Sequence, residues 1–305
     1  GYTGFIKSLD KEYEHTKCRT IDFMNELEEI KVSDLLLQEM LCNDEPSVIY
    51  YKDEQRHTIQ ETHHPLLTEN QQALTLEKEA VILVLGGAQG ITSALTTHLS
   101  KEYPCHYILV GRSVYPDVQG IPPDVKTRED IRKFLIGQGF SKSPAEIEHK
   151  TSQLYKAMQI VSTMETIKSH GARVSYHAVD VRDEEKLIQL IQTLYAKYGR
   201  IDGVIHGAGI LEDKLFQNKT PDSFERVFST KVTPLRVLAE HLKADTKFIV
   251  FFSSIASVYG NRGQTDYAAA KQCTGSLHRS AAKKDEGKGN GYQLGPLERC
   301  GYGFC

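Results

Sequence analysis

Hydrophobic and polar positions follow one pattern over the first 75 residues and another over the rest of the chain. In the first part, segments with helical spacing alternate with short apolar runs that favour strands. The expected elements, in chain order, are residues 1–14 (helix), 18–23 (strand), 25–41 (helix) and 47–60 (strand). A polar stretch follows them, without any Gly-rich turn. We therefore expect a small α/β unit over residues 1–75.

From residue 77 onward, apolar strands alternate with amphipathic helices in a longer series. This alternation is typical of a parallel sheet that helices cover on both faces. The expected strands are residues 80–86, 107–112, 173–181, 202–209 and 247–254. Helical spacing also predicts a helical insert over residues 113–170. We expect a Rossmann-like, doubly wound parallel sheet over residues 76–290, followed by an irregular tail over residues 291–305.

Composition and charge narrow the class of protein. The 305 residues, 40% of them hydrophobic, can bury a core in about two domains. A net charge of -3 predicts no nucleic-acid surface, and no apolar run reaches the ~18 residues of a membrane span. The six cysteines form no Cys-x-x-Cys pair and no His-Glu-x-x-His occurs, which predicts a reducing, cytoplasmic location and no metal site. Because Gly1 lies inside a helical pattern, we expect one module of a longer polypeptide.

A Gly-rich turn, "VLGGAQGIT", stands between the first strand of the second part and an amphipathic helix. Gly86 suits a sharp turn, Gly90 leaves room for a diphosphate, and the helix start at Ile91 offers unpaired N–H groups. The expected cofactor contacts in this turn are Gly86, Gly87, Ala88, Gln89, Gly90 and Ile91. The alternative is a tight strand-to-helix turn without a ligand.

Three further strand ends are expected at the same edge of the sheet. Arg112 and Ser113 stand where an NAD-binding fold places an acidic residue, so we expect the 2′-phosphate of NADPH there. The other two ends offer a carboxylate and an apolar neighbour for an adenine ring, and small residues beside the cofactor: Asp180, Val181, Gly207, Ala208 and Gly209. Each is more often structural by itself, but together they outline one crevice.

The stretch "SSIASVYGNRGQTDYAAAK" combines the residues needed to protonate a carbonyl. Tyr267 follows Ser254 by 267 − 254 = 13 residues, and Lys271 lies one helical turn further on. A nearby ammonium lowers the pKa of a phenol from its ordinary value of about 10. Tyr13 and Lys17 repeat the Tyr-x-x-x-Lys spacing but have no serine that far upstream. We therefore expect Tyr267 to be the acid and Ser254 to bind the carbonyl oxygen.

The motifs "VLGGAQGIT", "LVGRS", "GAGILEDKL", "STKV" and "FFSSIASVYGNRGQTDYAAAK" together resemble the ketoreductase domain of modular polyketide synthases, within the short-chain dehydrogenase/reductase superfamily. Residues 1–75 are similar to a truncated, Rossmann-like structural half of that domain. The insert is similar to trans-acyltransferase and polyunsaturated-fatty-acid types. The resemblance implies NADPH-dependent reduction of a 3-ketoacyl thioester, which an acyl carrier protein presents on its phosphopantetheine arm beside neighbouring synthase domains.

The resemblance also implies a catalytic lysine at Lys231, with Ser254 and Tyr267. The chain departs from the family pattern at Lys271, where an asparagine is expected. Two ammonium groups about 4 Å apart would repel by roughly 4 kcal/mol at an effective dielectric constant of 20. We therefore expect one lysine to turn to solvent or lose its proton. We favour Lys231 as the cation that acts on Tyr267, because Lys271 could instead cap a helix face or contact the nicotinamide ribose.

Other parts of the resemblance concern the product and the tail. Residues 211–213 (Leu-Glu-Asp) are similar to the signature of B-type ketoreductases, and Tyr259 replaces the tryptophan of the A-type, which implies a D-configured 3-hydroxyacyl product. Pro296 is similar to a proline that helps seat the nicotinamide, but the family's lid helix and last strand do not follow it. Two alternatives remain, a non-catalytic remnant inside a megasynthase and a stand-alone short-chain alcohol dehydrogenase.

Overall fold

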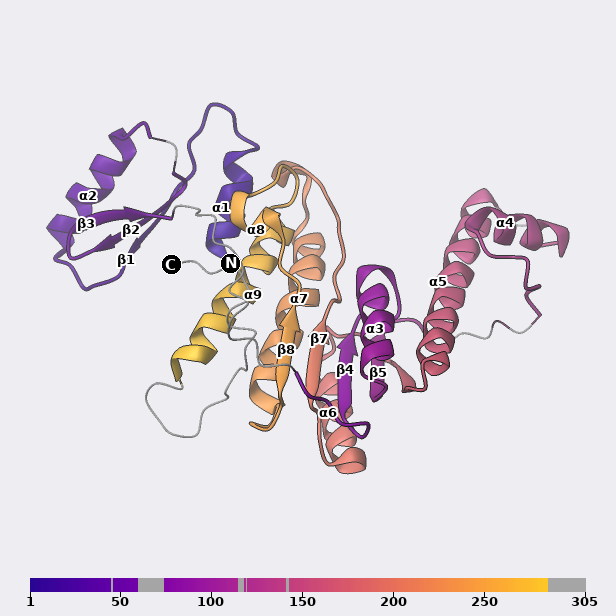
Figure 1. Ribbon diagram of the computed structural model, residues 1–305. Coiled ribbons are helices and arrows are strands. Elements are labelled where there is room, and N and C mark those ends of the chain that lie inside the picture. Colours follow the sequence, from indigo (N-terminus) through magenta and orange to yellow (C-terminus); the bar gives the residue numbers. More distant parts are fainter. Residues whose placement is uncertain (45, 60–73, 115–117, 119, 141–142, 285–305) are drawn as a thin grey trace.

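A computed structural model describes residues 1–44, 46–59, 74–114, 118, 120–140 and 143–284 (Figure 1). The strands are β1 (Thr20–Phe23), β2 (Val48–Lys52), β3 (Gln55–Thr58), β4 (Val81–Leu85), β5 (His106–Gly111), β6 (Arg173–Ala178), β7 (Gly203–His206) and β8 (Phe248–Phe251). The helices are α1 (Tyr2–Asp10), α2 (Glu29–Leu41), α3 (Gly90–Glu102), α4 (Arg128–Gly137), α5 (Pro144–Ser169), α6 (Glu184–Tyr198), α7 (Pro221–His241), α8 (Ile255–Tyr259) and α9 (Thr265–Lys284), with a 3-10 turn η1 (Phe216–Asn218).

The larger sheet has five parallel strands in the order β6-β5-β4-β7-β8. The chain starts at the central strand β4, moves outward to β6, and then returns past β4 to β7 and β8. The predicted doubly wound sheet is therefore confirmed. In such a sheet the direction of winding reverses at the first strand, so the carboxyl ends of β4 and β7 border a crevice where ligands bind.

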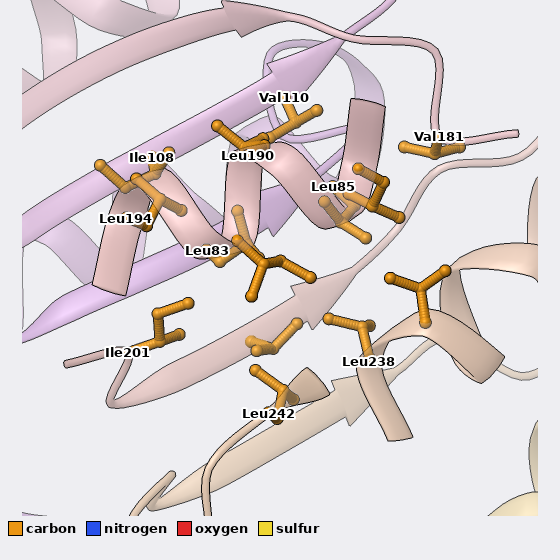
Figure 2. Close-up of a cluster of buried hydrophobic side chains, with 14 of the residues drawn as sticks. Leu83, Leu85, Ile108, Val110, Val181, Leu190, Leu194, Ile201, Leu238 and Leu242 are labelled. Atoms are coloured by element: carbon orange, nitrogen blue, oxygen red, sulfur yellow. The ribbon is translucent and has the colours of Figure 1, made fainter. Parts of the chain in front are cut away.

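Alternate residues of these strands feed two separate hydrophobic cores, one on each face. Leu83, Leu85 and Ile108 point to the face that α6 and α7 cover, where they meet Leu190 and Leu238 (Figure 2). The intervening strand residues point to the opposite face and pack against α5: Ile82, Val84, Tyr107, Leu109 and Ile205. Both faces are apolar because both are covered, which explains why these strands read as continuous apolar runs.

The smaller sheet has the strand order β1-β2-β3, with β1 and β2 parallel and β3 antiparallel to β2. The β1-α2-β2 unit is the simplest parallel crossover, as expected of a partial Rossmann-like half. The single strand predicted over residues 47–60 was wrong, because the chain reverses between β2 and β3. Asp53 and Glu54 adopt φ of +51° and +61° there, a two-residue turn without glycine that the alternation of polar residues concealed.

Helix α1 precedes the smaller sheet in the sequence but packs against α8 and α9 of the larger region (Figure 1). Gly4 allows this approach, since an added Cβ would lie 2.3 Å from the carbonyl oxygen of Ala268. The Lys7 ammonium donates to the carbonyl oxygen of Val258 at 2.6 Å, and the hydroxyl of Ser8 accepts from the backbone N–H of Asn261 at 3.1 Å. The first helix of the chain is therefore part of the wall around Tyr267, more than 250 residues away in sequence.

The insert between β5 and β6 contains α4 and α5. Thr127 and Ser143 begin these helices with reciprocal capping boxes, and Pro144 occupies the first turn of α5, as its position predicts. Ile131 and Leu135 of α4 pack against Leu154, Tyr155 and Met158 of α5 in a small core of their own. Among the helices that the structure describes, none combines the length and apolar character needed to cross a membrane.

Candidate active site

The Gly-rich turn joins β4 to α3 at the carboxyl edge of the larger sheet. Gly86 has φ of +77°, and a Cβ on it would lie 2.6 Å from the backbone nitrogen of Ala208. A Cβ on Gly87 would lie 2.5 Å from Cγ1 of Val84. Gly90 begins α3 with φ of +60° and with open space where its Cβ would be. The first two glycines permit close packing, and the third leaves room for a diphosphate at the helix start.

The segment after β7 forms the opposite wall of this turn. A Cβ on Gly207 would lie 1.9 Å from Oγ1 of Thr92, and one on Gly209 would lie 3.2 Å from Cε of Lys231. The two segments lie together because β4 and β7 are hydrogen-bonded neighbours. The predicted residues 207–209 and the Gly-rich turn therefore belong to one cradle, which larger side chains would fill.

Helix α5 of the insert fastens the Gly-rich turn from outside. Oγ1 of Thr163 donates to the carbonyl oxygen of Ala88 at 3.2 Å and lies 2.7 Å from Oγ of Ser93. Nε2 of Gln89 donates to the carbonyl oxygen of Lys156 at 3.2 Å. The sequence analysis missed Thr163, because nothing in the helical pattern of the insert shows which face of α5 meets the turn.

The predicted 2′-phosphate residues lie at the end of β5. The side chain of Arg112 is exposed, and Ser113 is partly buried. The hydroxyl of Tyr176 donates to the carbonyl oxygen of Ser113 at 2.8 Å, which ties the end of β5 to β6. Arg112 can therefore reach an anion from solvent, while the backbone at Ser113 is held in place.

The residues after β6 are already engaged with other groups. The guanidinium of Arg182 lies 2.6 Å from Oδ2 of Asp180, and this contact lowers the pKa of the Asp180 carboxyl. Val181 is buried in the core that α6 and α7 cover. Asp180 lies at the edge where the adenine was predicted, but its carboxylate already accepts from Arg182.

Tyr267 and Ser254 meet at the carboxyl end of β8. Ser254 caps α8, where its hydroxyl accepts from the backbone N–H of Ala256 at 3.2 Å. Burial raises the pKa of Tyr267, while a hydrogen bond between the Ser254 and Tyr267 side chains lowers it and the charge of Asp213 raises it. The net direction is upward, so the phenol keeps its proton at neutral pH. This differs from the lowered pKa expected from a nearby ammonium, because burial is the largest influence on Tyr267.

Lys231 of α7 and Lys271 of α9 lie side by side in the wall of the site, and both are buried. Nζ of Lys271 donates to the carbonyl oxygen of Phe252 at 2.6 Å and lies 5.2 Å from the ring centroid of Tyr267. The two lysine side chains are hydrogen-bonded to each other. Burial and the neighbouring Lys271 lower the pKa of Lys231 to about 6. Burial also lowers the pKa of Lys271, so two ammonium groups side by side in this wall are disfavoured.

His206, the last residue of β7, borders the lysine pair and is fully buried. Burial and the charge of Lys231 lower its pKa to about 3. Because Nε2 lies 3.2 Å from the carbonyl oxygen of Lys231, the neutral ring donates from Nε2 and fixes the backbone of α7 at that lysine. His206 stands directly before the small residues of the cradle in the sequence. This position was the sequence signal that could have identified it as a site residue.

A buried ion pair adjoins Tyr267. Nζ of Lys219 lies 2.8 Å from Oδ2 of Asp266, and both side chains are almost fully buried. The same ammonium donates to the carbonyl oxygen of Glu212 at 3.1 Å. The sequence analysis missed this pair, because the two residues lie 47 positions apart and only Asp266 stands beside a predicted site residue.

The residues predicted to select the product lie in the loop after β7. The side chain of Leu211 is 61% exposed. Glu212 is bound by Arg226, and Oδ2 of Asp213 accepts from Nε2 of Gln264 at 2.9 Å. Tyr259 is 54% exposed at the end of α8.

Pro296 and the rest of the predicted tail lie outside the described residues. Within the described part of the chain, no group of three or more His, Cys, Asp or Glu side chains is arranged to hold a metal ion.

Comparisons with known proteins agree with this geometry. The family model described as "KR domain" matches residues 80–296. One of the polyunsaturated fatty acid synthase subunits of Thraustochytrium sp. is 31% identical over 215 residues, which are 66% of this chain and 8% of the Thraustochytrium protein. The polyketide synthase PksL of Bacillus subtilis is 26% identical over 276 residues, 88% of this chain and 5% of the synthase. The chain thus spans a small part of these relatives.

Solved structures share the fold. An N-terminal ketoreductase from the macrolactin assembly line superposes with a TM-score of 0.67 at 20% identity, over 93% of this chain and 49% of that one. A ketoreductase domain from the bacillaene assembly line gives a TM-score of 0.64 at 23% identity, over 93% and 58%. Both superpositions cover 93% of this chain, which is more than the part from residue 80 onward. The shared fold therefore includes residues before the start of the family-model match at residue 80.

Proposed function

Because this chain belongs to the KR domain family of oxidoreductases, we propose that it catalyses the NADPH-dependent reduction of a 3-ketoacyl thioester to the 3-hydroxyacyl thioester. The observation that carries the proposal is the meeting of Tyr267 and Ser254 at the sheet edge that also holds the Gly-rich turn. A proton donor and an oxygen-binding hydroxyl beside a dinucleotide cradle suit carbonyl reduction.

The cradle fits a dinucleotide. Gly86 and Gly207 have no space for a side chain, while Gly90 opens the start of α3 to a diphosphate. The exposed guanidinium of Arg112, at the end of β5, supports NADPH over NADH because it can pair with a 2′-phosphate. Bound there, NADPH supplies hydride to the carbonyl carbon.

In this proposal the chain's own residues manage the carbonyl oxygen. The hydroxyl of Ser254 donates a hydrogen bond to the oxygen and holds it beside Tyr267. Tyr267 transfers its phenolic proton to the same oxygen as negative charge develops there. The raised pKa of Tyr267 keeps that proton in place until the charge appears.

The two lysines have different roles in this proposal, because they differ in charge. Lys271 carries the cation that stabilises the phenolate left on Tyr267, and the carbonyl of Phe252 orients its ammonium. Lys231, neutral at pH 7, accepts a hydrogen bond from Lys271 and so removes the repulsion between two ammonium groups. This assignment gives the cation to Lys271, whereas the family resemblance favoured Lys231. Both residues remain in the proposed site.

The product and the partner follow from the family. The B-type, D-configured alcohol is supported by the similarity of residues 211–213 to the B-type signature; of these residues, Asp213 accepts from Gln264, directly before α9. An acyl carrier protein bearing a phosphopantetheine-linked chain is the proposed substrate carrier. The multidomain synthases that the chain resembles support neighbouring synthase domains as further partners.

Oxidation of NADPH in the presence of a 3-ketoacyl N-acetylcysteamine thioester tests the proposal. We expect turnover that yields the D-3-hydroxy product and that needs Tyr267. NADPH binding without turnover would instead indicate a non-catalytic remnant. A preference for simple ketones over the thioester would indicate a stand-alone alcohol dehydrogenase.

A further inference from the structure

Two segments that are distant in sequence meet close to Tyr267. One is the loop over residues 209–219, which contains Asp213 and η1. The other is the turn over residues 260–264, which leads directly into α9. The backbone N–H of Lys214 donates to the carbonyl oxygen of Gly263 at 3.0 Å, so the segments touch through their main chains. The position of Tyr267 depends on how firmly they are held together.

Glu12, which follows α1, binds both segments at once. Its Oε1 accepts from the backbone N–H of Gly263 at 3.0 Å, and its Oε2 accepts from the backbone N–H of Phe216 at 2.6 Å. Carboxylate-to-amide hydrogen bonds are stronger than neutral ones. One side chain from the first region of the molecule therefore joins the two segments.

Helix α1 is itself anchored on both sides of this bridge. The ring of Phe5 meets that of Phe216 edge to face, with centroids 5.5 Å apart. Gly4 lies against the backbone of Ala268, the residue after Tyr267. A Cβ on Gly260 would lie 2.3 Å from the carbonyl oxygen of Lys7, so the turn also presses on α1. The helix that precedes Glu12 is therefore held in place by packing on both sides.

We propose that Glu12 is a positioning residue of the reductase, which clamps residues 209–219 to residues 260–264 and thereby fixes Tyr267 against the substrate carbonyl. The inference rests on the function proposed above. It assigns the first region of the chain a specific part in turnover, through one carboxylate and two backbone amides.

Substitution of Glu12 by Ala and by Gln tests the clamp, with Glu14→Ala as the matched control. Glu14 lies on the same segment, is 77% exposed, and is 3.8 Å from its partner Arg262. We expect Glu12→Ala to lower kcat by about 10- to 100-fold, the cost of a small misplacement of reacting groups. Glu12→Gln, which keeps one acceptor oxygen, should fall between. The Kd of NADPH should stay unchanged, because the cradle lies elsewhere.

Amide hydrogen exchange gives a readout that does not need turnover. We expect faster exchange at residues 214–218 and 260–266 in Glu12→Ala, and no change in Glu14→Ala. Unchanged exchange in those segments, equal loss of kcat in both variants, or a parallel loss of NADPH affinity would each overturn the inference. If the unsubstituted chain reduces no 3-ketoacyl thioester, the proposed function fails, whereas the exchange comparison still decides whether Glu12 forms the clamp.

Discussion

The two regions of the molecule contain the same parallel strand-helix-strand unit but stabilise it differently. The larger sheet is packed on both faces by aliphatic side chains, as Figure 2 shows for one face. Beside the smaller sheet, Glu39 is buried among charged and polar partners. It accepts from Arg56, Arg19 and the hydroxyl of Tyr51, at 2.5, 2.8 and 2.8 Å. The smaller region thus combines a few buried apolar residues, such as Ile49, with a buried ion-pair network.

This difference explains where chemistry is possible. Fully covered strands end at a rigid edge, so the groups after β4, β7 and β8 are held in place by the packing behind them. The smaller region has no Gly-rich turn, and the polar network around Glu39 stabilises that region itself. In the described part of the chain it reaches the site through α1 and the residues that follow it, such as Glu12.

The largest expected difference between the two regions concerns the two tyrosines that share the Tyr-x-x-x-Lys spacing. Tyr267→Phe should lower kcat by about 10²- to 10⁴-fold, because it removes the proton donor. Tyr13→Phe, in the smaller region, should leave kcat unchanged. Initial rates of NADPH oxidation measure both. Full turnover in Tyr267→Phe would exclude the proposed mechanism.

The lysine pair gives the next largest effect. Lys271→Met should lower kcat by about 100-fold, since the ammonium beside the Tyr267 ring is lost. Lys231→Met should have a smaller effect on kcat at pH 7, because that amine is already largely uncharged. Rates of the two variants at one pH test this order, and the reverse order would return the cation to Lys231.

Glu39→Gln should destabilise the smaller region without affecting chemistry. It leaves Arg19 without its buried carboxylate partner, and breaking a buried pair costs about 3 kcal/mol in the free energy of unfolding. Urea unfolding and kcat are measured on the same samples. The exposed pair of Lys31 and Glu54 provides the control, since Glu54→Gln should leave the unfolding free energy almost unchanged. A large fall in kcat for Glu39→Gln would mean that the regions are coupled beyond α1.

Arg112→Ala addresses the cofactor edge of the larger region. We expect the Kd of NADPH to rise by about 10-fold, because a charge-assisted contact with the 2′-phosphate is lost. The Kd of NADH, which has no such phosphate, should not change. Titrations followed by cofactor fluorescence measure both, and equal changes for the two cofactors would remove Arg112 from the 2′-phosphate site.

A further expected effect is a pH dependence of stability. The pKa of Lys231 is about 6 in the folded chain and higher when it is unfolded. Between these values the unfolded chain binds the extra proton, so this group makes the fold more stable as pH rises. Lys231→Met should therefore be more stable than the unsubstituted chain near pH 7, and the difference should shrink toward about pH 10. Thermal unfolding across this range measures it, and a constant difference would contradict a neutral Lys231.

Much of the fold followed from local patterns. Continuous apolar runs predicted the strands of the larger sheet, and the strand, Gly-rich turn and helix at residues 80–102 predicted its phosphate edge. The family resemblance drawn from these motifs is confirmed by the KR domain match. The turn at Asp53 was missed, because it has no glycine or proline to interrupt the polar pattern.

The sequence alone determined which residues could supply chemistry, since glycine spacing, strand ends and the order of Ser254 and Tyr267 are local properties of the chain. Only the tertiary structure decided how Lys231 and Lys271 share one charge, because burial and proximity set their pKa values. It also brought Glu12 to a turn some 250 residues away. Long-range contacts of this kind leave no periodic signal, because they depend on how whole helices pack.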